Sequence, residues 1–290
     1  MSQNLKIFIE LTRLNKPIGY MLLFWPCIWG LTIAYDFSLS WRNYFFYAFL
    51  FFSGSVLMRS AGCIVNDIAD RNIDKLVDRT KNRPIASGKI SVLNASIYAS
   101  ILCFVAFLVL INFNIFTIYM ALFSMPLAFT YPLMKRFTYW PQLFLGITFN
   151  YGLVLAWISV QNEVSITPII FYFGAIFWTL GYDTIYGYQD IKDDEIIGVK
   201  STSIKFKKNP KLFIFLCYSI FISMQVITGV MMEFSNYYFI GIIIISVHLL
   251  IYQCLYLNVL NPNLCLKKFK SNNFLGLLVF LNILINKIYL

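Results

Sequence analysis

The chain has 290 residues, of which 59% are hydrophobic and 12% are charged, whereas in globular proteins about a quarter of all residues are charged. A chain of this composition cannot hide its apolar surface in one soluble core, so a soluble globular fold is excluded. The net charge of +10 would suit a nucleic-acid partner, but lysine and arginine also collect in the cytoplasmic loops of membrane proteins.

Nine apolar runs follow one another along the chain, each close to the roughly 20 residues that a helix needs to cross a bilayer. They predict membrane helices at residues 18–35, 44–66, 93–111, 115–133, 140–158, 165–188, 211–230, 235–257 and 272–289. The first run lacks a small-residue cleavage site, so a retained helix is predicted there in place of a signal peptide. We therefore expect an all-α, polytopic membrane protein formed by a single domain at residues 1–290.

The basic residues predict the orientation of these helices. If the N-terminus is cytoplasmic, every lysine and arginine except Arg42 and Lys287 falls on the cytoplasmic side. This pattern favours a bacterial inner membrane protein with its N-terminus inside and its C-terminus outside, and it accounts for the net charge without nucleic acid. The loop with Lys267, Lys268 and Lys270 is predicted to contact anionic lipid.

The cysteines and the histidine do not form a metal-binding pattern. The six cysteines are scattered without a Cys-x-x-Cys pair, and His248 is the single histidine. A zinc site, an iron–sulfur site or a disulfide framework is therefore not expected, and these residues are predicted to pack inside the protein.

Most of the 13 acidic residues gather in two short stretches. These are Asp67, Asp70, Asp74 and Asp78 in the first, and Asp183, Asp190, Asp193, Asp194 and Glu195 in the second. In a continuous helix, Asn66, Asp70 and Asp74 would share one face, as would Asp183, Asp190 and Asp194. Like charges on one face repel, so a cation is expected there. Oxygen ligands without histidine or cysteine favour magnesium, which prefers one or two carboxylates together with phosphate and water.

Basic residues accompany both acidic stretches. They are Arg79, Lys81 and Arg83 after the first stretch and Lys200 after the second. Together with magnesium, such groups can neutralise a diphosphate, which carries about three negative charges. The four residues are therefore predicted to bind the diphosphate of a substrate, the alternative being solvated loops whose acids pair with neighbouring lysines and arginines.

Two motifs connect these stretches to a known family. Residues 59–74 read Arg-Ser-Ala-Gly-Cys-Ile-Val-Asn-Asp-Ile-Ala-Asp-Arg-Asn-Ile-Asp, and the second motif runs from Tyr182-Asp183-Thr184 to Asp190-Ile-Lys-Asp-Asp194. Both resemble the motifs of the UbiA-type membrane prenyltransferases, and the resemblance extends over essentially the whole chain. Residues 16–26 and 131–136 further resemble the hydroxybenzoate branch of that family.

The resemblance implies a fold and a set of site residues. It implies nine helices around a central cavity that two acid-rich loops cap from the cytoplasm. The implied magnesium ligands are Asn66, Asp70 and Asp74 for one ion and Asp190 and Asp194 for the other. Asp183 matches a further acid of the family, which is either a base for the aromatic acceptor or a structural carboxylate. The implied catalytic residues are Asp183 and the four aspartates among the magnesium ligands, namely Asp70, Asp74, Asp190 and Asp194. Arg136 matches an arginine that holds the carboxylate of the acceptor.

The resemblance also implies a reaction, the magnesium-dependent transfer of a polyprenyl group from polyprenyl diphosphate to 4-hydroxybenzoate, ortho to its hydroxyl, in ubiquinone synthesis. Naphthoate, homogentisate and haem are alternative acceptors. A secondary transporter is the rival from another class, but its ionisable groups would lie near the bilayer midplane, whereas these acids gather at one face. Besides the two substrates and lipid, neither nucleic acid nor an obligate protein partner is expected.

Overall fold

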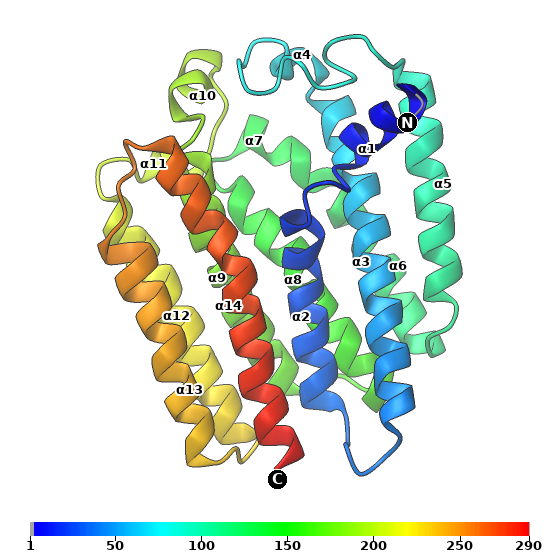
Figure 1. Cartoon of the computed structure of the whole chain (residues 1–290), viewed down its shortest axis with the longest axis vertical. Helices are drawn as coiled ribbons and strands as arrows, with labels where there is room; N and C mark the ends of the chain where they lie inside the picture. Colours follow the sequence, from blue (N-terminus) through cyan, green and yellow to red (C-terminus); the bar gives the residue numbers. More distant parts are fainter. Residues whose placement is uncertain (1–2, 290) are drawn as a thin grey trace.

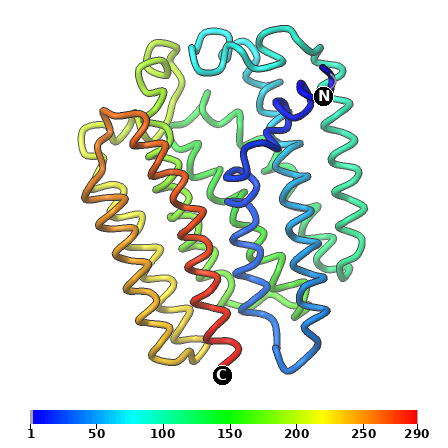
Figure 2. Tube along the Cα trace, in the orientation of Figure 1, coloured from blue at the N-terminus to red at the C-terminus, as the bar shows by residue number. Residues whose placement is uncertain are grey.

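The computed structural model describes residues 3–289, and in that range it contains helices and no β-strand. The long helices are α2 (Ile18–Ala34), α3 (Trp41–Ala69), α5 (Val92–Leu110), α6 (Ile115–Thr130), α8 (Pro141–Gln161), α9 (Ile166–Gly187), α12 (Pro210–Met231), α13 (Asn236–Ser246) and α14 (Pro262–Ile288). The shorter ones are α1 (Gln3–Thr12), α4 (Arg71–Asp74), η1 (Tyr131–Leu133), α7 (Met134–Phe137), α10 (Ile191–Ile197), α11 (Thr202–Lys205) and the π-helix η2 (Val247–Leu255), which continues α13. The long helices run side by side as a bundle (Figures 1 and 2).

Each of the nine expected runs contains a helix, but they do not all have the length and hydropathy of a membrane span. Seven helical segments of the described chain do, including the stretch from α6 to α7 and the one from α13 to η2. Helix α2 is apolar but has 17 residues, and α9 is not among the seven. The chain is thus a multi-pass membrane protein, and crossing by nine helices stays a prediction.

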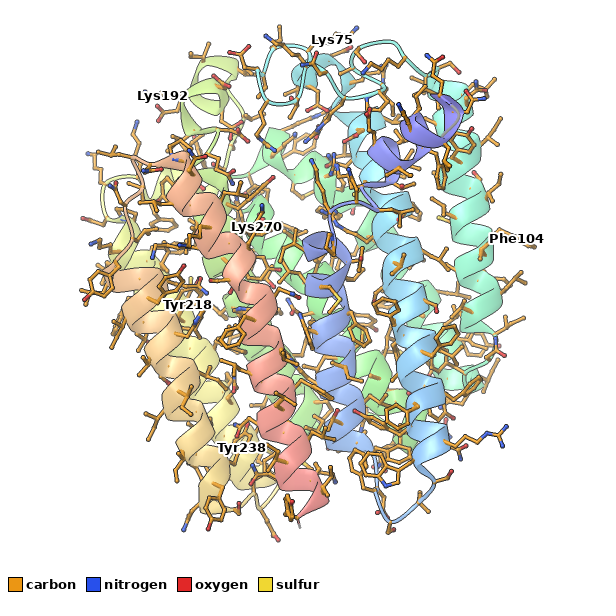
Figure 3. The ribbon with its side chains drawn as sticks, in the orientation of Figure 1. Lys75, Phe104, Lys192, Tyr218, Tyr238 and Lys270 are labelled. Atoms are coloured by element: carbon orange, nitrogen blue, oxygen red, sulfur yellow. The ribbon has the colours of Figure 1, made fainter. Side chains whose placement is uncertain are left out.

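Both acidic stretches lie at the same end of the bundle. Helices α4 and α10, which carry parts of them, lie at the top of Figure 1, the end at which the N-terminal helix also lies, and the C-terminus lies at the opposite end. Lys75 and Lys192 mark this end in Figure 3, whereas Phe104 points outward from the side of α5. The single-sided arrangement that the sequence predicts is therefore present in the fold.

Close packing of helices holds the bundle together, because apolar side chains gain little from leaving lipid for protein. Helices α2 and α8 approach so closely at Gly30 that an added Cβ would lie 2.1 Å from the Leu153 carbonyl oxygen. Next to this contact, Trp29 stacks on Phe171 with ring centroids 5.6 Å apart. The centre of the molecule is thus filled with aromatic rings.

A buried network of hydrogen bonds joins α9, α12, η2 and α14. Tyr218 Oη donates to Gln253 Oε1 at 2.6 Å, and Trp178 Nε1 donates to Asn272 Oδ1 at 2.8 Å. Gln253 Nε2 donates to the same Asn272 oxygen at 3.0 Å. Interhelical hydrogen bonds of this kind hold helices together in lipid.

The last helix differs from the expectation. It begins at Pro262, ten residues before the expected start, because Asn261 caps it by accepting from Leu264 N at 3.1 Å. Lys267, Lys268 and Lys270 therefore lie in α14, so their assignment to a loop was wrong, whereas contact of the exposed Lys267 and Lys270 with anionic lipid stays a prediction. Lys268 is buried, donates to the Tyr252 carbonyl and lies 4.3 Å from the centre of the Tyr252 ring.

Candidate active site

A polar cavity of about 260 Å³ lies at the end of the bundle that carries the acidic stretches. Its polar lining comprises Asn66, Asp70, Asp74, Arg79, Thr80, Arg83, Tyr131, Lys135, Gln142, Asp183, Tyr186, Asp190, Asp194, Lys200 and Ser201. Every acid and amide expected near magnesium therefore faces one cavity. Three of the four basic residues expected at the diphosphate face it too.

The first acidic stretch turns at Asp70, contrary to the continuous helix assumed for it. Helix α3 ends at Ala69, and Asp70, with φ −95° and ψ 3°, links it to α4. The backbone N–H groups of Asp70 and Asp74 still donate to the carbonyls four residues earlier, at 2.9 and 2.8 Å. Asn66, Asp70 and Asp74 consequently stay on the cavity side despite the turn.

The second stretch is broken in a similar way. Helix α9 ends at Gly187, and Asp190 precedes α10, where Asp194 N donates to the Asp190 carbonyl at 2.9 Å. Asp183 lies on α9 and the other two acids lie beyond the break, yet all three line the cavity. Burial and the charge of Asp190 raise the pKa of Asp194 to about 6.

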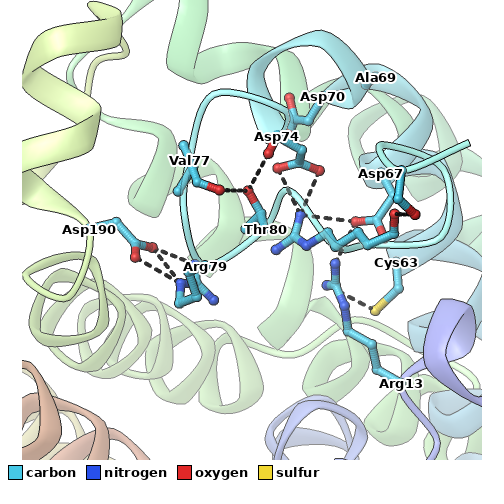
Figure 4. Close-up of polar contacts among 12 residues, drawn as sticks. Arg13, Cys63, Asp67, Ala69, Asp70, Asp74, Val77, Arg79, Thr80 and Asp190 are labelled. Atoms are coloured by element: carbon cyan, nitrogen blue, oxygen red, sulfur yellow. Dashed lines mark hydrogen bonds and ion pairs between the residues drawn. The ribbon is translucent and has the colours of Figure 1, made fainter.

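Ion pairs connect the two stretches across the cavity (Figure 4). Arg79, from the loop after α4, donates from Nε to both carboxylate oxygens of Asp190 at 2.8 and 2.9 Å, and also from Nη2. Arg83 Nη1 donates to Asp74 Oδ2 at 2.8 Å. Residues 111 positions apart thus meet at one site, and its acids are accompanied by cations suited to phosphate.

Two of the expected residues lie outside the polar cavity. Lys81 is exposed and pairs with the exposed Asp78 at 2.6 Å. Arg136 is also exposed, and its Nη2 donates to the Ala69 carbonyl at 2.5 Å. Its neighbour Lys135 lines the cavity instead and donates to Asp70 Oδ2 at 2.5 Å.

A second cavity, of about 380 Å³, lies deeper in the bundle between α2, α3, α5, α6 and α8. Its lining is mostly apolar, and Tyr131 lines both cavities. Its only exposed lining residues are Phe107 on α5 and Leu122 and Phe129 on α6, which are 42%, 44% and 42% exposed. The apolar cavity therefore reaches the lipid-facing surface between α5 and α6.

Arg59 is a basic residue in the wall of this apolar cavity. Its Nε is buried and has no hydrogen-bond partner within residues 3–289, and its Cζ lies 5.3 Å from the centre of the Phe149 ring. Sequence reasoning counted Arg59 among the cytoplasmic charges and assigned it no role. The signal that could have revealed it is its position ten residues before the end of α3, inside an apolar helix.

The cavity residues fit magnesium, provided that a substrate supplies part of the coordination. Asp70 Oδ1 is buried without a hydrogen-bond partner and forms only an ion pair with Arg136 Nη2, 4.0 Å away, so this oxygen can still accept a metal ion. Nowhere in residues 3–289 do three acid, histidine or cysteine side chains converge closely enough to hold a metal by themselves. Magnesium rarely needs such a cage, since one or two carboxylates with phosphate and water suffice.

Known proteins have sequences similar to nearly the whole of this chain. A relative from Drosophila pseudoobscura pseudoobscura, named 4-hydroxybenzoate polyprenyltransferase, mitochondrial, is 39% identical over 97% of this chain and 70% of its own length. A relative from Coxiella burnetii, named 4-hydroxybenzoate octaprenyltransferase, is 36% identical over 98% of both chains.

Known structures share the fold. A UbiA homologue from Aeropyrum pernix aligns with a TM-score of 0.74 and 20% identity over 92% of this chain and 97% of its own. One from Archaeoglobus fulgidus, bound to GPP and Mg²⁺, aligns with a TM-score of 0.68 and 19% identity over 96% and 99%. The sequence profile of the UbiA prenyltransferase family matches residues 23–283. The chain therefore belongs to the UbiA prenyltransferase family.

Proposed function

We propose that this protein transfers a polyprenyl group from polyprenyl diphosphate to the carbon ortho to the hydroxyl of 4-hydroxybenzoate, in ubiquinone synthesis. The products are 3-polyprenyl-4-hydroxybenzoate and diphosphate. One observation carries the proposal: an acid- and cation-lined cavity adjoins an apolar cavity that opens to lipid, and Tyr131 lines both. The relatives named 4-hydroxybenzoate polyprenyltransferase and octaprenyltransferase support this acceptor.

In the polar cavity, Asn66, Asp70 and Asp74 would hold one magnesium ion, and Asp190 and Asp194 the other. Bound magnesium supplies Lewis-acid polarisation of the diphosphate leaving group. The cavity's basic side chains bind the remaining phosphate oxygens and so stabilise the negative charge as the allylic carbon–oxygen bond breaks. These side chains are Arg79, Arg83, Lys135 and Lys200.

The apolar cavity would hold the prenyl chain. Its walls exclude water from the allylic cation, and a nearby aromatic face such as that of Phe149 can stabilise the cation by about 0.5–2 kcal/mol. A polyprenyl tail longer than the cavity leaves it between α5 and α6, where Phe107, Leu122 and Phe129 form the exposed rim.

The aromatic acceptor would bind between Arg59 and Asp183. Arg59 can donate to the acceptor's carboxylate, because its Nε is buried without a partner and because Arg136 lies outside both cavities. Asp183 can accept the phenolic proton as the ring carbon attacks. This attack on the allylic cation forms the new carbon–carbon bond. The ring carbon then loses its proton, the phenol oxygen regains one from Asp183, and aromaticity is restored.

The proposed setting is a bacterial inner membrane with nine crossing helices and the acidic loops facing the cytoplasm. Its support is the concentration of lysine and arginine at the end that holds α4, α10 and the N-terminus, with Arg42 and Lys287 as the exceptions. The proposed partners are the two substrates and membrane lipid.

The test offers purified protein in lipid vesicles a polyprenyl diphosphate, Mg²⁺ and one of several acceptors. The panel contains 4-hydroxybenzoate, a hydroxynaphthoate, homogentisate and haem, and products are identified by mass. We expect prenylated 4-hydroxybenzoate and an equal amount of diphosphate, with no product in excess EDTA. A product from another acceptor alone would contradict the acceptor assignment, and substrate counterflow without any transfer would favour the transporter.

A further inference from the structure

A chain of ion pairs leads from the N-terminal segment into the polar cavity (Figure 4). Arg13 Nη2 donates to Asp67 Oδ1 at 2.5 Å, and Arg83 Nη1 donates to the same oxygen at 3.1 Å. Arg83 also donates to Asp74, which lines the cavity as Arg83 does. Asp67 is 1% exposed and does not line the cavity, so it holds two guanidinium groups from behind the site.

Arg83 is held between two acids that compete for it. The same nitrogen, Nη1, faces Asp67 Oδ1 at 3.1 Å and the two oxygens of Asp74 at 3.0 and 2.8 Å. Asp67 Oδ2, in contrast, is buried without a hydrogen-bond partner. A buried carboxylate is stable only when cations and donors compensate its charge. Without Arg13, Arg83 would be the one cation left to Asp67 and would move toward it, away from the cavity.

The backbone at Arg13 shows that its surroundings determine its position. Arg13 follows α1 directly and has a φ of 55°, in the left-handed region that residues other than glycine seldom adopt. Leu11 and Thr12 beside it are buried, and Arg13 Nη1 also lies 3.5 Å from Cys63 Sγ on α3. The segment between α1 and α2 is thus tied to α3 at the residue that contacts Asp67.

We propose that Arg13 is a positioning residue, which acts through Asp67 to keep the Arg83 guanidinium at the polar cavity, where it meets the diphosphate of the prenyl donor. This rests on the proposed function, because it takes Arg83 as a diphosphate-binding group. The N-terminal segment then contributes to donor binding although Arg13 touches no substrate.

The first test replaces Arg13 in the full-length protein in lipid vesicles. Arg13→Ala should weaken the binding of inorganic pyrophosphate, measured calorimetrically with Mg²⁺ present, roughly tenfold and raise the KM for the prenyl diphosphate by a similar factor. The KM for the acceptor should not change, whereas kcat should fall as well, because Arg83 also stabilises the leaving diphosphate. Arg13→Lys, which keeps a cation near Asp67, should restore part of the pyrophosphate affinity.

The second test asks whether Arg13 acts through Asp67. In a protein that already carries Asp67→Asn, adding Arg13→Ala should reduce the pyrophosphate affinity by less than about twofold. The reason is that the side chain at position 67, through which Arg13 acts, no longer carries a charge. An equal effect in both backgrounds would overturn the proposal. So would unchanged pyrophosphate affinity in Arg13→Ala. If Arg13→Ala does not accumulate, Arg13→Gln is compared with Arg13→Lys in both backgrounds by the same criteria.

The control is Arg71→Ala, which removes an exposed arginine of the same stretch. Arg71 donates to the Ile68 carbonyl at 3.2 Å and does not line the cavity, so pyrophosphate affinity should not change. The two proposals fail differently. Absence of prenyl transfer by the unaltered protein would contradict the proposed function, whereas intact transfer with an unaffected Arg13→Ala variant would contradict only the role of Arg13.

Discussion

Two regions of the molecule bury polar side chains, and they differ in how completely those side chains are paired. In the buried network that joins α9, α12, η2 and α14, the side chains of Trp178, Tyr218, Gln253 and Asn272 form hydrogen bonds with one another. At the two cavities, Asp70 Oδ1 and Arg59 Nε have no hydrogen-bond partner within the described chain. Complete pairing holds helices together, whereas an unpaired group that faces a cavity leaves an interaction for a ligand to make.

An unpaired buried polar atom points to a ligand site only if it also faces a cavity. Gln225 on α12 is fully buried, and neither of its amide atoms has a hydrogen-bond partner in residues 3–289. It lines neither the polar nor the apolar cavity, so its amide faces neither of the two sites proposed for the substrates. An unpaired polar atom therefore indicates a functional role only where the fold also leaves space beside it.

The largest effect is expected at the acids. Asp190→Asn removes a carboxylate charge from the proposed magnesium site and should reduce prenyl transfer by on the order of a thousandfold. Transfer is measured in membranes that contain equal amounts of protein. Asp78→Asn, at an exposed acid of the first stretch that does not line the cavity, is the matched control and should stay near the unaltered rate. Near-normal transfer by Asp190→Asn would refute the metal assignment.

The next effect is expected at Arg59. Arg59→Met removes the guanidinium from the wall of the apolar cavity and should raise the KM for 4-hydroxybenzoate roughly a hundredfold, because the acceptor's carboxylate loses a charged hydrogen-bond partner. The KM for the prenyl donor should change little. Arg136→Met, at the exposed arginine that the family resemblance favours, should leave the acceptor KM within about threefold of that of the unaltered protein. A larger increase in the acceptor KM with Arg136→Met than with Arg59→Met would restore the assignment to Arg136.

A substitution in the buried network that joins α9, α12, η2 and α14 should lower the stability of the protein without changing its activity. Asn272→Leu keeps similar volume but leaves Trp178 Nε1 and Gln253 Nε2 without their acceptor, at a cost of about 1–3 kcal/mol. Unfolding in bicelles measures the loss, and the rate of transfer per folded molecule should not change. A lower rate per folded molecule with normal stability would show that the network serves catalysis.

A smaller effect, which depends on the length of the prenyl donor, is expected on the side where the apolar cavity opens to lipid. Ala106 on α5 is buried and lines this cavity, so Ala106→Trp should obstruct a long prenyl tail and lower transfer from an octaprenyl donor about tenfold. Transfer from a geranyl donor should be affected much less. Phe104→Trp, on the outward face of α5 (Figure 3), is the control. Equal losses with both donors would argue against an exit between α5 and α6.

The smallest effect is expected at Lys81, which the sequence places among the diphosphate-binding residues. Because it is exposed and pairs with the exposed Asp78 outside the cavity, Lys81→Ala should change the donor KM less than twofold. Lys135→Ala should raise the donor KM more, since Lys135 lines the cavity and contacts Asp70. Steady-state kinetics on both variants would decide which of the two lysines binds the donor.

The sequence by itself determined the membrane class, the helical runs and the two acidic stretches. Helices follow from local pattern in lipid, because each backbone group must find its partner within its own segment. The motifs around Asp70 and Asp190 further identified the family, which the match over residues 23–283 confirms. Local pattern was less reliable at helix ends, where the cap at Asn261 placed Lys268 inside α14.

Only the tertiary structure decided which cations meet which acids. Arg13 and Asp67 are 54 positions apart, and Arg79 and Asp190 are 111 apart, so no local spacing relates them. The choice of Lys135 over Arg136 at the polar cavity likewise depends on the turn at η1 and α7. Such contacts arise because α2 packs against both α3 and α8 and because α8 packs against α9, whereas a helical repeat places only residues of the same helix.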